Sequence, residues 1–215
     1  MTRLLLLLLV CLWGPAYVDA STGEDITWNY DEDRSGQLPP KFMIGTFSDG
    51  RPAGDWKVIT MPKALSPPNV FAQSRAKGAG YNVVLIDNAQ AADLDLSVSF
   101  LPISGKTDMG GGLIWRATDD RNYYLTRANP LEQNIRVYHV VKGIRKMIGD
   151  YNEIIDIKKW HRLHVVNQGC HIQIFYDEKP IFDLCDETFK EGRIGLWTKS
   201  DAVTYFDDLR LQFLP

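Results

Sequence analysis

The sequence lacks the features that identify several large classes of protein. Its net charge is −3 and it has no block of basic residues, so nothing points to nucleic acid or to an anionic membrane surface as a partner. It shows no long helical pattern, no repeat with a solenoid or propeller period and no low-complexity linker. One domain is therefore the simplest organisation.

The signatures of common hydrolases are also missing. There is no Gly-x-Ser-x-Gly motif and no His-Glu-x-x-His motif. Sandwich glucanases carry several carboxylates at alternate positions of one strand, so all of these carboxylates face the cleft. The nearest acidic run here, Asp183–Glu187, places Asp183 and Asp186 on opposite faces of a regular strand. Glycoside hydrolysis of the glucanase type is therefore disfavoured.

Histidine is scarce, with four in the chain. His161 and His164 are three residues apart, so on a strand they point to opposite faces and cannot share a metal ion. A histidine on a strand is more often a surface or hydrogen-bonded structural residue. His139 and His164 stay as candidates for acid–base catalysis.

No metal or cofactor signature is present. The acidic cluster Asp31–Asp33 is interpreted as a solvated turn, and the alternative is a set of carboxylate ligands for Ca²⁺. The spacing of an EF-hand loop is absent. The glycines Gly110–Gly112 precede a strand but no helix follows, so we expect a bulge or a close backbone approach there instead of phosphate binding.

The N-terminus has the order of a secretory signal peptide. Met1–Arg3 carries one positive charge, Leu4–Trp13 is apolar, and the small-residue tripeptide Val18–Ala20 follows. The apolar run is too short to span a bilayer, which takes about 20 residues. We predict a signal peptide over residues 1–20, with cleavage after Ala16 as the alternative, and a secreted or periplasmic protein.

Cysteine is also scarce, since removal of the leader leaves Cys170 and Cys185 alone. The sequence around them predicts a hairpin that turns at Asp177-Glu178, and counting outward from a two-residue loop places Cys170 directly opposite Cys185. In an oxidising space we expect a disulfide between them. A bulge at Gly169 would change the spacing, and two free thiols are the alternative.

What the sequence does contain is a series of short apolar or alternating segments separated by turn residues. Leu94–Phe100 alternates without a fault, and Tyr81–Asp87 is apolar almost throughout, as in a strand covered on both faces. We predict an all-β, antiparallel two-sheet jelly-roll sandwich that forms a single domain over residues 21–215. Short strands punctuated by glycines are predicted from Phe42 to Val58, of which Asp55–Ile59 is the clearest. The other predicted strands are Ile26–Tyr30, Tyr81–Asp87, Leu94–Phe100, Leu113–Ala117, Tyr123–Arg127, Ile135–Val141, Trp160–Val166, Ile172–Tyr176, Ile181–Leu184, Ile194–Thr198 and Val203–Phe213.

Aromatic residues beside arginine, asparagine and aspartate form two segments, at residues 110–138 and 195–208. Sugars offer C–H faces that stack on aromatic rings and hydroxyls that bind paired donors and acceptors, so such segments favour sugar binding. The alternative is that Trp115 and Trp197 fill the core. Strand parity separates Trp115 from Arg116, and we favour Arg116 for the groove. The candidate substrate-binding residues are Arg116, Tyr124, Arg127, Asn129, Trp197, Lys199 and Asp201.

Four stretches carry a family resemblance: residues 111–124, Arg127–Tyr138, Trp160-His161 and Gly192–Leu209. They resemble the concanavalin-A-like lectin/glucanase superfamily, closest to the secreted bacterial 3-keto-disaccharide hydrolase domain, with laminin-G-like modules nearby. The chain departs from the hydrolase group by carrying Gly-Gly-Gly-Leu-Ile-Trp-Arg where that group has Asn-Ser-Gly-Ile-Phe-Leu-Arg. The resemblance implies a jelly roll with a ligand groove across one concave sheet.

If the hydrolase activity carried over, the resemblance would imply elimination followed by hydration. A ketone at C3 acidifies the C2 hydrogen, a base removes it, the glycosidic bond breaks and water adds. His139, His164, Tyr124, Lys199 or Asp201 would serve as base or electrophile, and the sequence does not choose among them.

Three functional hypotheses follow. The first is a secreted domain that binds or processes carbohydrate, with a glycan or small sugar as partner. The second is a 3-keto-glycoside hydrolase or lyase. The third is a cell-envelope adhesion or scaffold module that binds a protein. The position of His139 and His164 relative to Arg116 and Trp197 distinguishes the first two.

Overall fold

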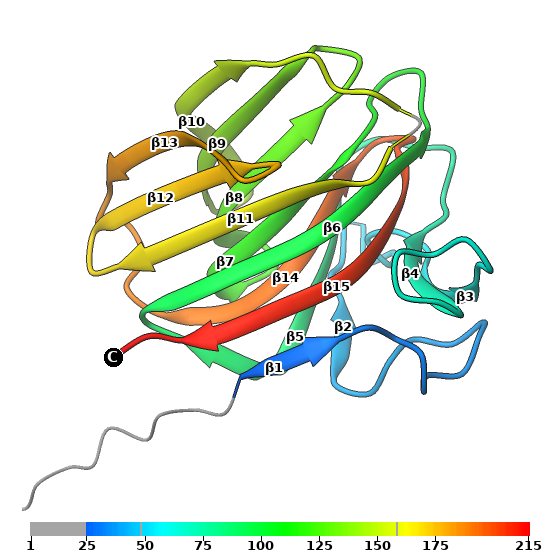
Figure 1. Ribbon diagram of the computed structural model, residues 1–215. Helices are drawn as coiled ribbons and strands as arrows, with labels where there is room; N and C mark the ends of the chain where they lie inside the picture. The colour runs from blue at the N-terminus through cyan, green and yellow to red at the C-terminus, as the bar shows by residue number, and fades with distance from the viewer. Residues whose placement is uncertain (1–24, 48, 158) are drawn as a thin grey trace, which may run out of the picture.

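The computed structural model describes residues 25–47, 49–157 and 159–215. These residues form two antiparallel β-sheets and no helix, which confirms the predicted all-β sandwich (Figure 1). None of the described segments is a helix of the length and hydropathy needed to cross a membrane. The predicted signal peptide lies outside the described residues, so secretion stays a prediction.

The first sheet has eight strands, and its two long central strands pair with each other. Along the main path the order is β13 (Lys179–Cys185), β12 (His171–Tyr176), β11 (His161–Gln168), β6 (Leu94–Ser104), β15 (Val203–Phe213), β4 (Asn69–Gln73) and β3 (Trp56–Thr60). The short strand β1 (Ile26–Trp28) also pairs with β15, on the same edge as β4, while β6 pairs with the other edge.

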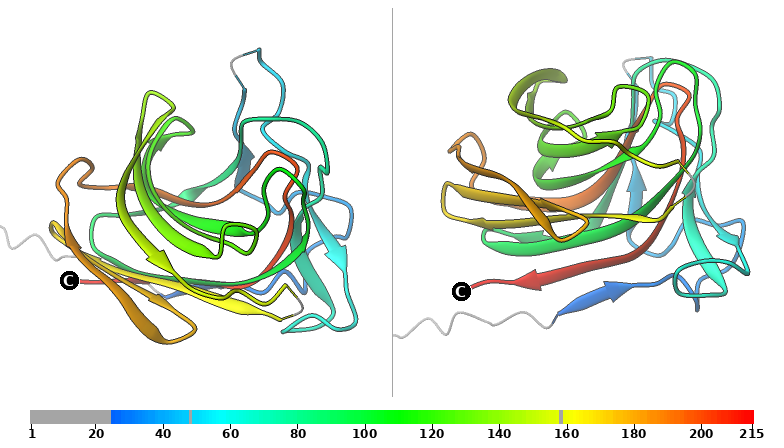
Figure 2. Two further views of the ribbon diagram at one scale, coloured as in Figure 1. Left: turned by 90° about the horizontal axis from the view of Figure 1, so that it is seen from above. Right: turned by 45° about the horizontal axis from the view of Figure 1, so that its top comes forward.

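The second sheet has seven strands and is strongly curved. Figure 2 shows it as a trough whose open side faces away from the eight-stranded sheet. We call that outer side the concave face. The order is β10 (Ile144–Asn152), β9 (Asn134–Val141), β8 (Asn122–Asn129), β7 (Gly111–Asp119), β14 (Gly192–Lys199), β5 (Tyr81–Ala91) and β2 (Phe42–Ile44).

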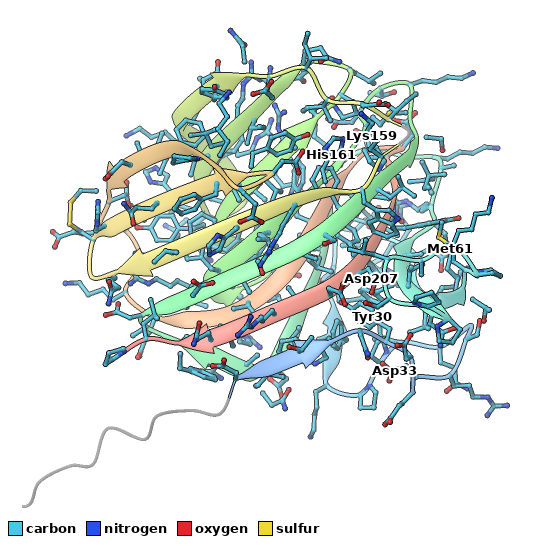
Figure 3. The ribbon with its side chains drawn as sticks, in the orientation of Figure 1. Tyr30, Asp33, Met61, Lys159, His161 and Asp207 are labelled. Carbon is cyan, nitrogen blue, oxygen red and sulfur yellow. A yellow bond between two sulfur atoms is a disulfide. The ribbon has the colours of Figure 1, made fainter. Side chains whose placement is uncertain are left out.

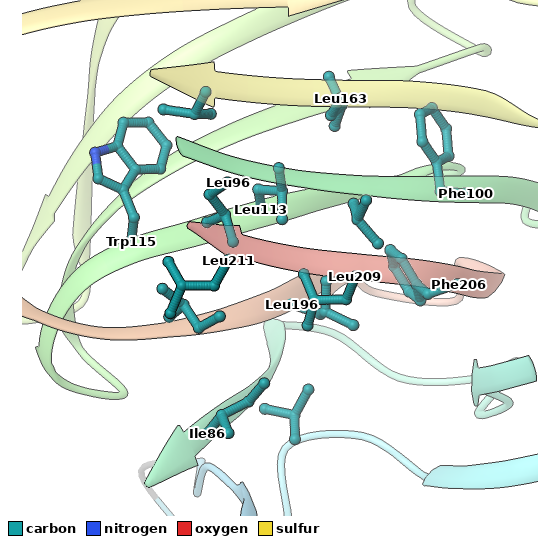
Figure 4. Close-up of a cluster of buried hydrophobic side chains, with 14 of the residues drawn as sticks. Ile86, Leu96, Phe100, Leu113, Trp115, Leu163, Leu196, Phe206, Leu209 and Leu211 are labelled. Carbon is teal, nitrogen blue, oxygen red and sulfur yellow. The ribbon is translucent and has the colours of Figure 1, made fainter. Parts of the chain in front are cut away.

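The core between the sheets follows from strand alternation. Leu94, Leu96, Val98 and Phe100 are all fully buried in it, as their period-two spacing predicts. Figure 4 shows such side chains from β6, β7, β11, β14 and β15 meeting between the two layers. Trp115 lies among them, so this tryptophan fills the core and does not bind sugar on an open face.

Two strands of the fold were not predicted. Strand β4 is buried although it begins with Asn69, whose side-chain amide donates to the carbonyl oxygens of Tyr30, Asp31 and Asp33. Strand β10 is an edge strand with mixed exposure and an irregular register between Met147 and Gly149, so its alternation is weak.

The glycines before β7 allow close backbone approach, as expected. A Cβ on Gly110, whose φ is +97°, would lie 2.1 Å from the carbonyl oxygen of Ala128. A Cβ on Gly111 would lie 2.7 Å from the ring of Phe206 on the opposite sheet. These positions therefore bring β7 close to β8 and to the eight-stranded sheet.

The acidic cluster near the N-terminus is part of a hydrogen-bonded loop. The Asp31 carboxylate accepts from the side-chain amide of Asn29 and from the backbone N–H of Asn69. Within the described part of the chain, no group of three or more histidine, cysteine, aspartate or glutamate side chains is arranged to hold a metal ion.

Cys170 and Cys185 are disulfide-bonded, with Cα atoms 4.8 Å apart. The two-residue turn at Asp177-Glu178 is also observed, with φ positive at both residues as a type I′ turn requires. The expected register was wrong by one residue, because Cys185 pairs with His171. The physical reason is a bulge: the register shifts between Ile174 and Phe175.

Removing the disulfide should destabilise the fold. Its cysteines are 15 residues apart, and closing a loop of that length stabilises a protein by about 3 kcal/mol in the chain-entropy account. We expect C170A/C185A to lower the free energy of unfolding by about 2–3 kcal/mol in urea titrations, with the reduced wild-type chain as the control. A loss below about 0.5 kcal/mol would contradict a stabilising role.

A second prediction concerns Asp207, a fully buried carboxyl that accepts the backbone N–H groups of Ser66 and Asp208. Burial raises the pKa of Asp207 to about 6. Because the folded pKa lies above the unfolded value of about 4, this group stabilises the fold fully below about pH 4, and the contribution is lost as pH rises through about 6.

We therefore expect the wild type to lose about 2–3 kcal/mol of stability relative to Asp207→Asn between pH 4 and pH 7. Urea unfolding of both chains at four pH values measures the difference. A stability difference that stays constant with pH would show that Asp207 titrates normally.

Candidate functional site

The strand register arranges the side chains of the concave face in rows. Gly112 of β7 pairs with Trp197 of β14 on one side and Arg127 of β8 on the other, and the row continues through Arg136 of β9 to Asp150 of β10. The adjacent row is apolar and consists of Gly195, Ile114, Leu125, Tyr138 and Met147. Charged and aromatic groups from four strands, β14, β8, β9 and β10, thus lie on one face.

The centre of this face is a second apolar cluster. Val83, Leu85, Tyr123, Tyr138 and Trp197 belong to it, and all five side chains are buried. The cluster is separate from the core between the sheets. Burial raises the pKa of the Tyr123 hydroxyl far above its usual value, in keeping with a dry environment.

Arg145 of β10 covers this cluster. Its guanidinium carbon lies 4.4 Å from the ring centre of Tyr138, 5.4 Å from that of Tyr81 and 5.8 Å from that of Trp197. These distances are typical of cation–π contacts. Trp197 is consequently only 2% exposed and forms the floor of the face, so it is not an open stacking platform.

A network of ion pairs lies beside the aromatic cluster. Glu132 accepts from Arg127 and from Arg136, each at 2.8 Å, and Arg136 also donates to Asp150 at 2.9 Å. The Arg127 guanidinium donates as well to the side chain of Asn134. Burial alone would raise the pKa of Glu132, but the two guanidinium groups outweigh it and hold the pKa below its usual value.

A second pair of charges lies at the end of β8 and β14. Lys199 donates to Asp108 at 2.9 Å, and the side-chain amide of Asn129 donates to the same carboxylate at 3.0 Å. Burial raises the pKa of Asp108 despite the lysine. Asp201 accepts the backbone N–H groups of Lys106, Thr107 and Asp108, so it fixes the loop that carries Asp108.

Arg116 lies elsewhere. Its φ is +49°, and the register of β7 shifts after Trp115, so β7 has a bulge at this point. The prediction that Arg116 faces the groove assumed a regular strand, in which side chains alternate between the two faces. Its guanidinium is 2% exposed and donates to the carbonyl oxygens of Ala92, Gly169 and Phe189 and to Asp93. All of these partners are protein groups away from the concave face.

Tyr124 and His139 form another group behind the same sheet. The Tyr124 ring stacks on Trp115 in the core and its hydroxyl donates to Asp186. His139 lies 3.3 Å from the same carboxylate. Burial would raise the pKa of Asp186, but hydrogen bonds from Thr188 and Tyr124 outweigh it and hold the pKa at about 2.

His164 belongs to the other sheet. It contacts Asp95 at 2.9 Å and stacks on Phe175, both on the outer face of the eight-stranded sheet. His139, His164 and Arg116 therefore do not lie beside Trp197 on the concave face. Of the seven predicted site residues, the structure brings together Arg127, Asn129, Trp197 and Lys199, with Asp201 in support.

Comparison with known proteins identifies the fold. No family model matches the chain. A carbohydrate-binding module, CBM66 from Bacillus subtilis, has a TM-score of 0.64 at 20% identity, covering 80% of this chain and 95% of the module. The Crh5 transglycosylase has a TM-score of 0.61 at 10% identity, covering 90% of this chain and 86% of that one. The fold is a concanavalin-A-like β-sandwich.

The sequence comparison gives one distant relative. A levanase from Bacillus subtilis (strain 168) is 24% identical over 140 residues, which are 64% of this chain and 20% of the levanase. The chain therefore matches about a fifth of that enzyme's length. The narrower resemblance to the 3-keto-disaccharide hydrolase domain has no support from a family model.

Several residues of this face were not among the predicted ones. Arg136 and Tyr138 lie in the segment 110–138 that favoured sugar binding but were not among the seven candidates; they alternate along β9 opposite Arg127 and Leu125. Glu132, Asp108 and Arg145 gave no signal, since loops and an unpredicted edge strand carry them.

Arg145 should stabilise the concave face. We expect Arg145→Ala to lower the free energy of unfolding by about 1–2 kcal/mol, through lost cation–π contacts and lost cover of the rings, and Arg145→Lys to lower it less. Lys146→Ala, at the exposed neighbouring position, is the control and should change stability by less than about 0.5 kcal/mol. Equal effects of Arg145→Ala and Lys146→Ala in urea titrations would refute this role.

Proposed function

We propose that the chain binds carbohydrate at the concave face of the seven-stranded sheet. The observation that carries the proposal is the row of charged groups held in fixed ion pairs beside a buried aromatic cluster. The partly exposed charged side chains in and beside this row are Glu132, Arg136, Asp150 and Lys199, at 28–41% of side-chain exposure. They form the surface that a ligand would meet first.

Sugar hydroxyls both donate and accept, so they match such a row. Carboxylates of Glu132 and Asp150 accept from hydroxyl groups, and the planar fork of Arg136 donates to two neighbouring oxygens. Because ion pairs already hold these side chains, little conformational entropy is lost when a ligand binds. Tyr81, partly exposed and paired with Lys199 across β5 and β14, supplies a ring face at the edge of the row.

The relatives support this choice of ligand class. One solved neighbour is named a carbohydrate-binding module and the sequence relative is named a levanase, so levan is the first polysaccharide to test. Because the match spans only 20% of the levanase, its catalytic activity is not part of the proposal.

Binding is favoured over keto-glycoside elimination. That reaction needs a base and an electrophile beside the bound sugar. The two histidines considered for it lie behind the sheet and on the opposite layer, where other side chains hold them. The concave face instead offers ion-paired side chains, which suit recognition better than proton transfer.

A glycan array followed by calorimetric titration tests the proposal. We expect the wild-type chain to bind at least one neutral glycan, and Arg136→Ala and Glu132→Gln each to weaken binding about tenfold or more. The matched control is Arg34→Ala, an exposed arginine on the loop between β1 and β2.

Unchanged affinity in both concave-face variants would move the site away from this face. Failure to bind any glycan would leave protein partnership as the better hypothesis. Release of free sugar from 3-keto-glycosides would restore the enzyme hypothesis.

A further inference from the structure

A hollow of about 700 Å³ lies on the opposite side of the molecule, on the outer face of the eight-stranded sheet. His161 and Asp207, labelled in Figure 3, mark strands β11 and β15, on which it lies. Its volume is within the range of about 300–1,000 Å³ that is usual for small-molecule sites. None of the residues predicted to bind sugar lines it.

Hydroxyl groups form the floor of the hollow. Ser97 and Ser99 of β6 are buried and line the hollow from below. Ser97 pairs with Arg210 of β15, which in turn pairs with Thr27 of β1, and Ser99 pairs with Arg162 of β11. Four adjacent strands therefore present a continuous polar surface, and three of them, β6, β11 and β15, are paired on both edges.

A β-bulge supplies a carboxylate to this floor. The register of β15 shifts between Asp207 and Arg210, and Asp208 has φ +48°. Asp207 is consequently buried while Asp208 lines the hollow, where one of its oxygens accepts from the Ser66 hydroxyl at 2.8 Å. Bulges are common beside binding sites because they redirect a side chain in this way.

The remaining charges of the described lining are paired with one another. Arg162 contacts Glu178 at 3.1 Å, Arg210 contacts Asp25 at 3.2 Å, and His161 contacts Asp177 at 2.8 Å. Arg162 also donates to Ser97 at 2.9 Å. The carboxylates of Asp25, Asp177 and Glu178 are thus each paired with an arginine or histidine, whereas the Asp208 carboxylate accepts from the Ser66 hydroxyl. The lining thus favours a neutral ligand over a strongly charged one.

Apolar surface is also present. Trp160 is partly buried just before β11, and Leu65 on the loop between β3 and β4 is half exposed. An indole ring beside hydroxyl, carboxylate and guanidinium groups is the combination that sugars require, since their C–H faces stack while their hydroxyls exchange hydrogen bonds.

We propose that this hollow is a second carbohydrate-binding site, which takes a neutral sugar unit independently of the concave face. Trp160 stacks on the ring, Asp208 accepts from its hydroxyls, and the forks of Arg162 and Arg210 donate to its oxygens. The two sites lie on opposite layers of the sandwich, so one chain can contact two strands of a polysaccharide or two points of one strand. This proposal rests on the hollow alone and stands whether or not the concave face binds.

The test uses the full chain carrying Arg136→Ala, which weakens the concave face. Oligosaccharides of levan, inulin, cellulose and xylan are titrated calorimetrically, with oligogalacturonate as the charged counterpart. We expect at least one neutral oligosaccharide to bind once per chain, and Trp160→Ala to weaken that binding about tenfold or more. Asp208→Asn, which keeps the shape of the side chain, should weaken it as well and covers the case in which Trp160→Ala disturbs folding.

Gln173→Ala is the matched control, because Gln173 lies on the same outer face and outside this hollow. It should leave the affinity unchanged. Unchanged affinity in both Trp160→Ala and Asp208→Asn would overturn the proposal, as would binding of oligogalacturonate alone or of no oligosaccharide at all. If Arg136→Ala has no effect on the wild type while Trp160→Ala abolishes binding, the second site stands and the concave-face proposal fails.

Discussion

The seven-stranded sheet buries side chains on both of its faces, and the rest of the structure depends on this. One face packs against the eight-stranded sheet. The other curves until an arginine from the edge strand β10 reaches the rings of Tyr81, Tyr138 and Trp197. The aromatic cluster thereby becomes a floor, and the polar groups at its margin become the accessible surface. Recognition on this face is consequently a matter of fixed charges and hydroxyl-binding groups more than of open aromatic stacking.

Two bulges decide which polar side chains are available for binding. At Arg116 the positive φ sends a guanidinium into the protein, where three carbonyl oxygens and Asp93 bind it and tie together distant loops. At Asp208 the same kind of backbone step turns a carboxylate outward beside Ser66. Both residues lie in stretches whose sequence is typical of a regular strand. The bulge gives Arg116 a structural role inside the protein and turns Asp208 toward the surface.

Alternation made much of the fold predictable from the sequence. The alternation of Leu94–Phe100 correctly predicted which of its side chains are buried. The predicted hairpin around Asp177-Glu178 is observed, and the two cysteines on its strands are bonded as expected. What alternation could not reveal was an inserted residue, since a bulge changes the facing of every side chain after it. That is why Arg116 and the register of Cys185 were misplaced. Arg145 and Asp108 were out of reach for another reason: long-range contacts alone bring them to the face.

The most direct test of the central claim is the ¹H–¹⁵N spectrum of the tryptophan indole groups during titration with a bound glycan. Trp197 lies on the concave face, whereas the indole N–H groups of Trp56 and Trp115 donate to Ala53 and Asn167 inside the protein. We predict that the Trp197 signal shifts as the concave face fills while those of Trp56 and Trp115 stay in place. Saturable glycan binding that leaves the Trp197 signal unmoved would contradict binding at this face.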